Sequence, residues 1–218
     1  MRITAGIVAY SAAVADLPLE LPAPYADTLL AALDKEGKIQ RALETLGPVA
    51  GRDDAVIGGG PAELARFEAL AHDVTAVAAP AAPGTLQVST PAESFDAVVA
   101  RWSAFNGVDA RDLAEADRVL RPDGRLLVVH DYGRDDVSRL RGDLPEYRLW
   151  SRRDGPFLSV GFRIRVVHCF WTFASLEEVG SFLGGAFGDA GAALAATLRR
   201  PRLSYNVAVY HRNRGGGV

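Results

Sequence analysis

Hydrophobic residues follow two different patterns on the two sides of residue 50. Between residues 25 and 46, in YADTLLAALDKEGKIQRALETL, they recur every three or four positions, which predicts a helix. Gly37 interrupts this pattern and is a point at which the helix can divide in two. The stretch before it, LPLELPAP, is too rich in proline for a helix. We therefore expect residues 1–50 to form a helical N-terminal segment ahead of the main fold.

After residue 51, short apolar runs alternate with amphipathic stretches of about a dozen residues. The predicted strands are DAVIGG, DVTAVAAP, TLQVST, FDAVVARW, RLLVVHDY, FRIRVVHCFWTF and RLSYNVAVYHR. PAELARFEALAH, DARDLAEADRVL and SLEEVGSFLGGAFG are predicted helices, the last with Ser175 as its N-cap and Glu178 three residues on. This alternation predicts a parallel, doubly wound α/β sheet over residues 51–212, with helices on both faces. Residues 213–218 are a predicted flexible tail.

Composition and charge exclude several classes of partner. The 24 Lys and Arg against 27 Asp and Glu give a net charge of −3, whereas a nucleic-acid surface needs clustered positive charge. No run reaches the roughly 18 apolar residues that cross a membrane, and ITAGIVAYSAAVA follows only one Arg, unlike a secretory signal. The lone Cys169 excludes an internal disulfide and fits a reducing compartment. We expect a cytoplasmic protein without nucleic-acid or membrane partners and, with no HExxH-like spacing, without a metal.

Three glycines, Gly58, Gly59 and Gly60, lie between a buried strand and a helix. Glycines in this place permit positive φ and let a ligand approach the backbone beside the free N–H groups of the helix. A dinucleotide site would need GxGxxG, but the third glycine position holds Glu63, whose carboxylate would repel a pyrophosphate. The acid expected about 20 residues later is also missing, since the second strand ends at Ala78. A flavin or nicotinamide site is therefore not expected.

The same loop fits the pattern GxGxG, with Gly58, Gly60 and Ala62 in the glycine positions. The stretches ESFDAVVARWSAFN, EADRVLRPDGRLLVVHDYG, WTFASLEEVGSFLGGAFG and YNVAVYHR follow it in order. With these landmarks, roughly residues 50–212 resemble the class I S-adenosylmethionine-dependent methyltransferases. The resemblance implies a Rossmann-like sheet of seven strands, six parallel and the last antiparallel, with the N-terminal segment as a lid over the cofactor cleft. It also implies S-adenosylmethionine as cofactor, with Gly58, Gly59, Gly60 and Ala62 cradling its methionine end.

The three acids that hold the cofactor in this family have other residues in their place. Val56 stands two residues before the first glycine, and Ala78 ends the second strand, where the family's acid bonds both ribose hydroxyls. The family's third acid follows the third strand and meets the adenine amine. The polar residues at this place in the chain are Ser89, Thr90 and Glu93. Since a charged hydrogen bond contributes about 1.5–3 kcal/mol, affinity should fall unless Glu63 or the pair Asp53–Asp54 compensates. Backbone and apolar contacts would then hold the adenosine.

The carboxyl ends of the fourth and fifth predicted strands bring further candidates to the crevice. Arg101 and Trp102 end the fourth strand and are candidates for cofactor binding, with core packing as the alternative for Trp102. His130 and Asp131 end the fifth, and His130 beside Asp131 is the candidate catalytic base, with a turn-capping histidine as the alternative. An anionic substrate, or solvent alone, would meet three arginines of RLWSRRDGPF: Arg148, Arg152 and Arg153.

Two functions are consistent with these residues. The first is an S-adenosylmethionine-dependent methyltransferase that acts on a small molecule. The second is a methyltransferase-like protein that has lost turnover and binds a ligand or a partner, a hypothesis motivated by Val56 and Ala78 in the positions of the family's acids. A homodimer is compatible with either function.

Overall fold

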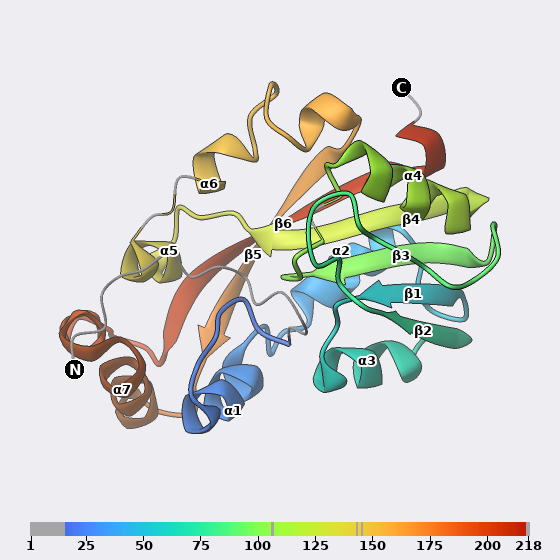
Figure 1. Cartoon of the computed structure of the whole chain (residues 1–218). Coiled ribbons are helices and arrows are strands. Elements are labelled where there is room, and N and C mark those ends of the chain that lie inside the picture. Colours follow the sequence, from blue (N-terminus) through green and yellow to red (C-terminus); the bar gives the residue numbers. More distant parts are fainter. Residues whose placement is uncertain (1–15, 106, 143, 145, 217–218) are drawn as a thin grey trace.

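Six strands form one mixed sheet in the described part of the chain, and five of them share one direction (Figure 1). The computed structural model describes residues 16–105, 107–142, 144 and 146–216. The strands are β1 (Asp53–Ile57), β2 (Asp73–Val77), β3 (Phe95–Arg101), β4 (Leu120–Asp131), β5 (Arg163–Thr172) and β6 (Arg202–Asn213). Their order in the sheet is β2-β1-β3-β4-β6-β5. Strands β2, β1, β3 and β4 pair in parallel, whereas β6 runs antiparallel to both β4 and β5.

Helices cover both faces of this sheet, with α4 in front of it and α2 behind it in Figure 1. The helices are α1 (Ala23–Ala32), α2 (Lys38–Leu46), α3 (Pro61–Glu68), α4 (Ala110–Val119), α5 (Asp136–Arg141), α6 (Glu146–Leu149) and α7 (Leu176–Ala195). Two short 3-10 helices, η1 (Leu158–Val160) and η2 (Arg214–Gly216), complete the described elements. The α/β architecture and the antiparallel last strand agree with the expectation from the sequence.

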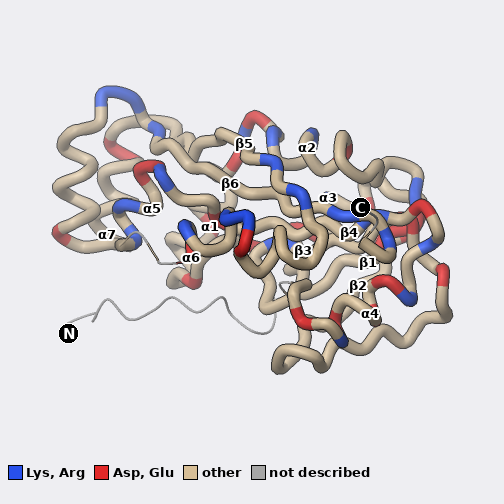
Figure 2. Tube along the Cα trace, turned by 90° about the horizontal axis from the view of Figure 1, so that it is seen from above, with Lys and Arg blue, Asp and Glu red and all other residues tan. Residues whose placement is uncertain are grey.

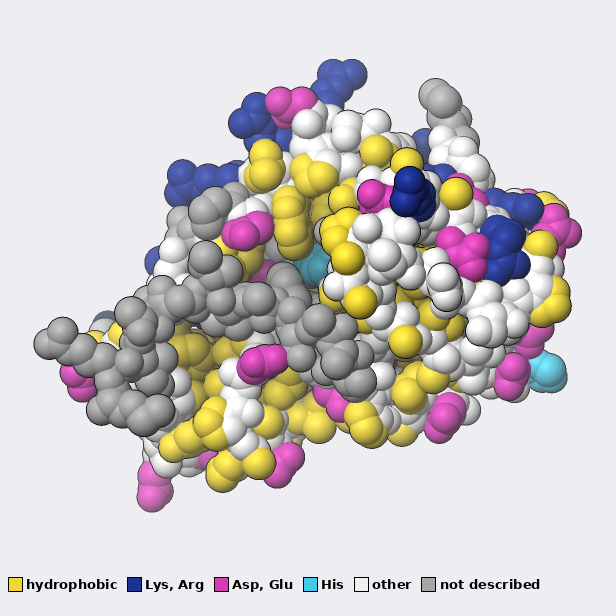
Figure 3. All heavy atoms as spheres, viewed as in Figure 1, with side chains coloured by type: hydrophobic (Ala, Val, Ile, Leu, Met, Phe, Trp, Pro, Cys, Tyr) yellow, Lys and Arg dark blue, Asp and Glu magenta, His cyan; other side chains and the backbone are white. Residues whose placement is uncertain are grey.

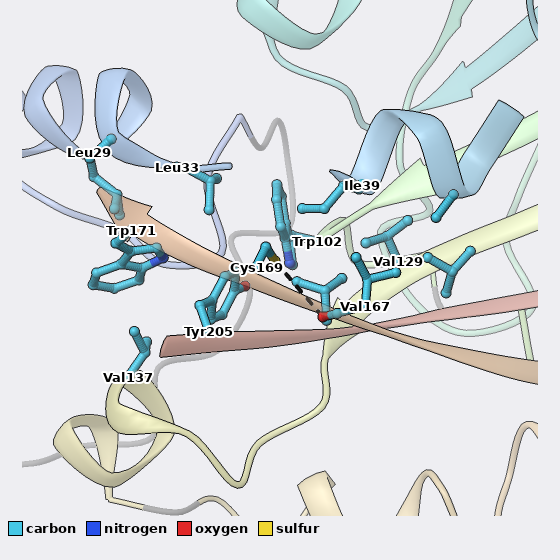
Figure 4. Close-up of a cluster of buried hydrophobic side chains, with 14 of the residues drawn as sticks. Leu29, Leu33, Ile39, Trp102, Val129, Val137, Val167, Cys169, Trp171 and Tyr205 are labelled. Carbon is cyan, nitrogen blue, oxygen red and sulfur yellow. Dashed lines mark hydrogen bonds between the residues drawn. The ribbon is translucent and has the colours of Figure 1, made fainter. Parts of the chain in front are cut away.

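Successive residues of the central strands join two different hydrophobic cores, because side chains alternate across a strand. Val99 and Val129 belong to a core that also holds residues of α1, α2, α3 and α7. Val98 and Val128 belong to a second core on the opposite face, which includes residues of α4. Figure 4 shows part of the first core, in which Trp102 lies near Ile39 and the buried Cys169.

The N-terminal helix predicted over residues 25–46 is divided near Gly37, as its sequence allows. Gly37 adopts a positive φ of 64° ahead of α2, and the side chain of Asp34 caps this helix by accepting hydrogen bonds from Lys38 N at 3.0 Å and Ile39 N at 2.8 Å. The run ITAGIVAYSAAVA lies outside the described residues. The division of the chain at residues 50 and 212 remains a prediction.

The prediction of a seventh strand is wrong, because the stretch TLQVST does not form a strand among the described residues. Side chains of α4 bond the backbone of this stretch and so take the groups that a strand ladder would use. Leu86 N donates to Asp112 at 2.8 Å and Val88 N to Glu115 at 3.0 Å. Arg118 in turn donates to the carbonyl of Val88 at 2.8 Å. Strand β2 is therefore one edge of the sheet. Five strands of the described part run in the same direction, where six were predicted.

Charges are interspersed over the molecule rather than gathered by sign (Figure 2). None of the helices in the described part of the chain is long and apolar enough to cross a membrane. Within residues 16–105, 107–142, 144 and 146–216, no group of three or more His, Cys, Asp or Glu side chains could hold a metal ion.

Candidate functional site

The order of the strands predicts a crevice beyond the carboxyl ends of β1 and β3. From β1 the chain moves outward to β2, and then crosses to β3 on the other side of β1 before it continues to β4. At such a switch point the two neighbouring loops leave in opposite directions and open a space in which ligands bind. The glycine loop, residues 58–60, follows β1 here, and Arg101 and Trp102 stand at the end of β3.

Two glycines of the loop are required by close packing within the protein. Gly58 has a positive φ of 67°, and its N–H donates to the carbonyl of Val77 at 2.8 Å, which ties the loop to the end of β2. A Cβ at Gly58 would lie 2.7 Å from that of Ser103, and one at Gly59 would lie 2.6 Å from a methyl group of Val56. Side chains at either position would collide with their neighbours.

The third glycine, Gly60, faces a carboxylate from the N-terminal segment. Asp16 accepts hydrogen bonds from Glu63 N at 2.8 Å and from Ala62 N at 3.3 Å, in the first turn of α3. A Cβ on Gly60 would overlap this carboxylate. The amino end of a helix attracts anions through its free N–H groups and its dipole. The crevice therefore already holds one carboxylate, supplied by the protein itself.

A second carboxylate, that of Glu63, is buried directly beneath the loop. Its side chain is 2% exposed, and its nearest charged partner is Arg101, whose Nε lies 3.5 Å from Glu63 Oε1. Burial raises the pKa of Glu63 to about 7, against the lowering effect of Arg101. Neither carboxylate oxygen has a hydrogen bond among the described residues. Glu63 thus lies where the sequence suggested a compensating acid, but burial favours its neutral form.

Trp102 lies deeper than a residue that only lines a crevice. It has a positive φ of 49° and is fully buried, and Figure 4 shows its indole beside Leu33 and Ile39 in the first core. The Arg101 guanidinium carbon lies 4.8 Å from the centre of its ring. This packing shows that Trp102 supports the wall of the crevice from behind. A contact between Trp102 and a cofactor remains a prediction.

His130 and Asp131 point to opposite faces of the sheet, because they are neighbours in β4. The His130 ring lies 4.8 Å from that of Trp150 and 5.9 Å from that of Phe157, measured between centroids. Burial lowers the pKa of His130 to about 3, so its imidazole is neutral at neutral pH. On this face of the molecule, hydrophobic side chains surround a hollow in which a histidine is visible (Figure 3).

Asp131 is engaged on the other face by three side chains. It is ion-paired with Arg141, and it accepts hydrogen bonds from the hydroxyls of Tyr205 and Tyr147, the latter at 3.3 Å. Because these groups hold the carboxylate away from His130, the two residues do not form a hydrogen-bonded His–Asp pair. Their assignment as catalytic residues remains a prediction.

The other acids considered for the cofactor lie far from the glycine loop. Asp53 opens β1 and pairs with Arg121 at 2.7 Å, so the Asp53–Asp54 pair is at the opposite edge of the sheet and does not compensate for the missing acids. Glu93 precedes β3 at that same edge and pairs with Arg214 at 2.7 Å. At the carboxyl edge, Ala78 is exposed directly after β2.

The three arginines predicted to meet an anionic substrate are separated in the structure. Arg148 lines a cavity of about 430 Å³ together with Arg134, Arg139 and Tyr147, and this cavity follows the end of β4. Arg152 is exposed and pairs with a neighbouring aspartate at 2.8 Å, and Arg153 is exposed.

Two features of this edge could not be predicted from the sequence. Asp16 lies in a stretch without helical or strand periodicity, and it reaches α3 across 46 to 47 positions of the chain. The only indirect signal is that Gly60, as N-cap of α3, has no side chain of its own to cap the helix. Gln40 and Arg66, which line a second cavity, read as ordinary polar positions of two helices.

No family model and no curated protein matches the chain. Among solved structures, a protein described as a type II methyltransferase from Anaeromyxobacter dehalogenans is similar, with 19% identity, a TM-score of 0.49, and 80% of this chain and 94% of that one covered. A protein described as a methyltransferase from Bacillus halodurans has 14% identity and a TM-score of 0.38, over 78% and 96% of the two chains. The YcgJ protein from Bacillus subtilis has 15% identity and a TM-score of 0.41, over 81% and 97%. Two of these names agree with the family that the sequence resembles, and at these scores the likenesses carry no argument about the cofactor or activity of this chain.

Proposed function

We propose that this chain binds S-adenosylmethionine in the crevice beyond β1 and β3 and transfers its methyl group to a small molecule. The observation that supports this most is the Asp16 carboxylate against Gly60, bonded by the N–H groups of Ala62 and Glu63. A carboxylate also ends the amino-acid tail of S-adenosylmethionine. The same N–H groups would therefore suit the charged group that this cofactor would bring.

The residues of the crevice fit the tail of the cofactor better than its sugar. Gly60 and the N–H groups of Ala62 and Glu63 would receive the tail where they now receive Asp16. The sugar would lie near Ala78, which offers no carboxylate, so backbone and apolar contacts would hold the adenosine. When bound, the cofactor supplies a methyl group on a sulfonium, which is transferred by in-line displacement.

In this proposal Asp16 leaves the crevice before the tail of the cofactor enters, because the two carboxylates compete for the same N–H groups. Arg101, buried beside Glu63, provides a positive charge near the incoming anion. Trp102 fills the space behind Arg101 and excludes water from that side.

His130 and Asp131 remain the residues proposed to support transfer, with separate roles. The neutral imidazole of His130 would accept a hydrogen bond from the methyl acceptor. Since its low pKa makes it a weak base, the acceptor would carry an acidic O–H or N–H of its own. Asp131 would act only through the side chains that it holds, Arg141 and Tyr205.

Calorimetric titration with S-adenosylmethionine and with its demethylated product tests the proposal. We expect both ligands to bind, and Gly60→Val to abolish binding because the added side chain fills the place of the tail. Gly180→Val is the matched control, since a Cβ at Gly180 meets nothing within 4 Å. Ala78→Asp should tighten binding by supplying a carboxylate for the ribose. Absence of binding by wild type and Ala78→Asp at millimolar ligand would contradict the proposal.

A second function, binding without turnover, is favoured by the occupation of the crevice by Asp16 and by the engagement of Asp131. The two functions differ in one readout. A methyltransferase incubated with labelled S-adenosylmethionine and a small-molecule extract releases the demethylated product, whereas a binding protein retains the cofactor unchanged. Mass spectrometry of ligand carried through purification would identify what the crevice holds in the cell.

A further inference from the structure

A second cavity lies between α1, α2 and the carboxyl-terminal half of α3, and Arg101 at the end of β3 also lines it. Its volume is about 430 Å³, which is within the range of small-molecule sites. The polar and apolar residues that matter for its chemistry are Gln40, Arg66, Arg101, Asp34, Leu30 and Leu70. We refer to it as the arginine pocket.

Several polar atoms that line the arginine pocket have no hydrogen bond among the described residues. Both amide atoms of Gln40 are buried without a hydrogen bond among the described residues. The buried Nε of Arg101 also has no hydrogen bond within that part of the chain. Because an unsatisfied buried polar group costs about 1–3 kcal/mol, such groups are uncommon and often mark the place of a ligand.

The charges around the arginine pocket favour an anion. Arg66 and Arg101 both line it, and partial burial together with the positive charge of Arg101 lowers the pKa of Arg66. The acid nearest Arg101 is Glu63, at 3.5 Å, and burial brings the pKa of Glu63 to about 7. Asp34 also lines the pocket, but its carboxylate oxygens accept the two N–H groups at the start of α2. Two positive charges therefore face the pocket without full compensation.

We propose that the arginine pocket binds a small molecule that carries a carboxylate or phosphate group. The anionic group lies between Arg66 and Arg101, whose planar donors suit both chemistries. The amide of Gln40 bonds a polar group of the same ligand. Its hydrocarbon part lies against Leu30 and Leu70, and Leu70 is one of the few large hydrophobic side chains that are exposed, at 43%. This inference does not depend on the proposed methyl transfer.

Calorimetric titration with inorganic phosphate and with succinate tests the pocket, against sodium chloride at equal ionic strength. We expect at least one probe to bind saturably. The probe that binds more tightly shows whether the pocket prefers a phosphate or a carboxylate group. Arg66→Gln should weaken that binding at least tenfold, whereas Arg165→Gln, which removes the same charge from exposed β5, should leave it unchanged. Equal binding by wild type and Arg66→Gln would overturn the proposal, as would no binding of either probe beyond chloride.

Two further variants separate the arginine pocket from the glycine loop. Gln40→Leu should raise the melting temperature in buffer, because it removes an unsatisfied buried amide, and should reduce the rise caused by the binding probe. An undiminished rise in Gln40→Leu would contradict the place given to Gln40. Gly60→Val should leave phosphate or succinate binding intact even where it abolishes binding of S-adenosylmethionine. Loss of both would assign the anion to the glycine loop and overturn the separate pocket.

Discussion

Two buried carboxylates at the carboxyl edge of the sheet have opposite surroundings. Asp131, the last residue of β4, is held by an ion pair with Arg141 and by two tyrosine hydroxyls. Glu63, after β1, has no hydrogen bond among the described residues and lies 3.5 Å from Arg101. Both side chains are 2% exposed, so burial alone does not distinguish them.

The two carboxylates therefore differ in their hydrogen bonds. Asp131 is bonded by other side chains of the protein, whereas Glu63 lies in the region where we propose that ligands bind. At Asp131, both carboxylate oxygens accept hydrogen bonds, which connect the end of β4 to Tyr205 of β6 and to Arg141 of α5. At Glu63, in contrast, neither carboxylate oxygen has a hydrogen bond among the described residues, and the amide of Gln40 in the arginine pocket is also without one. A ligand gains most where the protein leaves its polar groups unpaired.

The largest expected effect is at Asp131. Asp131→Ala breaks the buried ion pair with Arg141, and breaking a buried pair costs about 3–5 kcal/mol in the free energy of unfolding. Urea denaturation measures this loss. Asp53→Ala, which breaks an exposed pair with Arg121 at the other edge, is the control and should cost much less. Similar losses in the two variants would remove the distinction drawn for Asp131.

The effect of Glu63 on the free energy of unfolding should depend on pH. Its pKa in the folded state, about 7, is above its ordinary value of 4.5, so the folded state binds the proton more tightly than the unfolded state. Stability is therefore greatest below pH 4.5 and falls as the pH rises toward 7, where the cost of ionisation becomes complete. Glu63→Gln cannot ionise, so it should come close to wild type at pH 4 and exceed it by about 1–3 kcal/mol at pH 8.5.

Denaturation of wild type and Glu63→Gln at these two pH values checks the sign. Asp54, whose pKa burial also raises to about 7, lies at the other end of β1 and has the same direction of pH dependence. Asp54→Asn is therefore the matched variant, and the two effects should add because the sites are far apart. A wild type that is more stable than Glu63→Gln at pH 8.5 would mean that the ion pair with Arg101 outweighs burial.

Asp16 should have a smaller effect on stability. Asp16→Ala removes the carboxylate that bonds the first turn of α3, and the loss of such a cap costs about 1 kcal/mol. Asp16→Asn keeps an oxygen that can accept these bonds and should lose less. Thermal denaturation compares the two, and an unchanged melting temperature in Asp16→Ala would show that the contact does not stabilise α3.

The sheet could be predicted from the sequence where strands are buried on both faces. DAVIGG and FDAVVARW are continuous apolar runs, and they form β1 and β3 as expected. The stretch TLQVST has an equally good strand pattern but does not form a strand, because Asp112 and Glu115 of α4 accept hydrogen bonds from its backbone. Tertiary hydrogen bonds of this kind leave no periodic signal in the chain.

The candidate site was predictable only in part, for similar reasons. The spacing of the glycines locates the crevice, since a strand, a glycine turn and a helix leave little freedom. The alternation of side chains along a strand already implies that His130 and Asp131 face opposite ways. Asp16, in contrast, reaches the loop through tertiary folding of a stretch without local pattern. Arg66 and Arg101 belong to different elements, and only the folded chain brings them to one cavity.

The competition between Asp16 and the tail of S-adenosylmethionine is the central claim, and titration calorimetry of Asp16→Ala with this ligand tests it most directly. If the cofactor replaces the Asp16 carboxylate on α3, Asp16→Ala should bind it more tightly than wild type although the variant is less stable. Equal or weaker binding by Asp16→Ala would contradict the claim, because the two carboxylates would then not share one place.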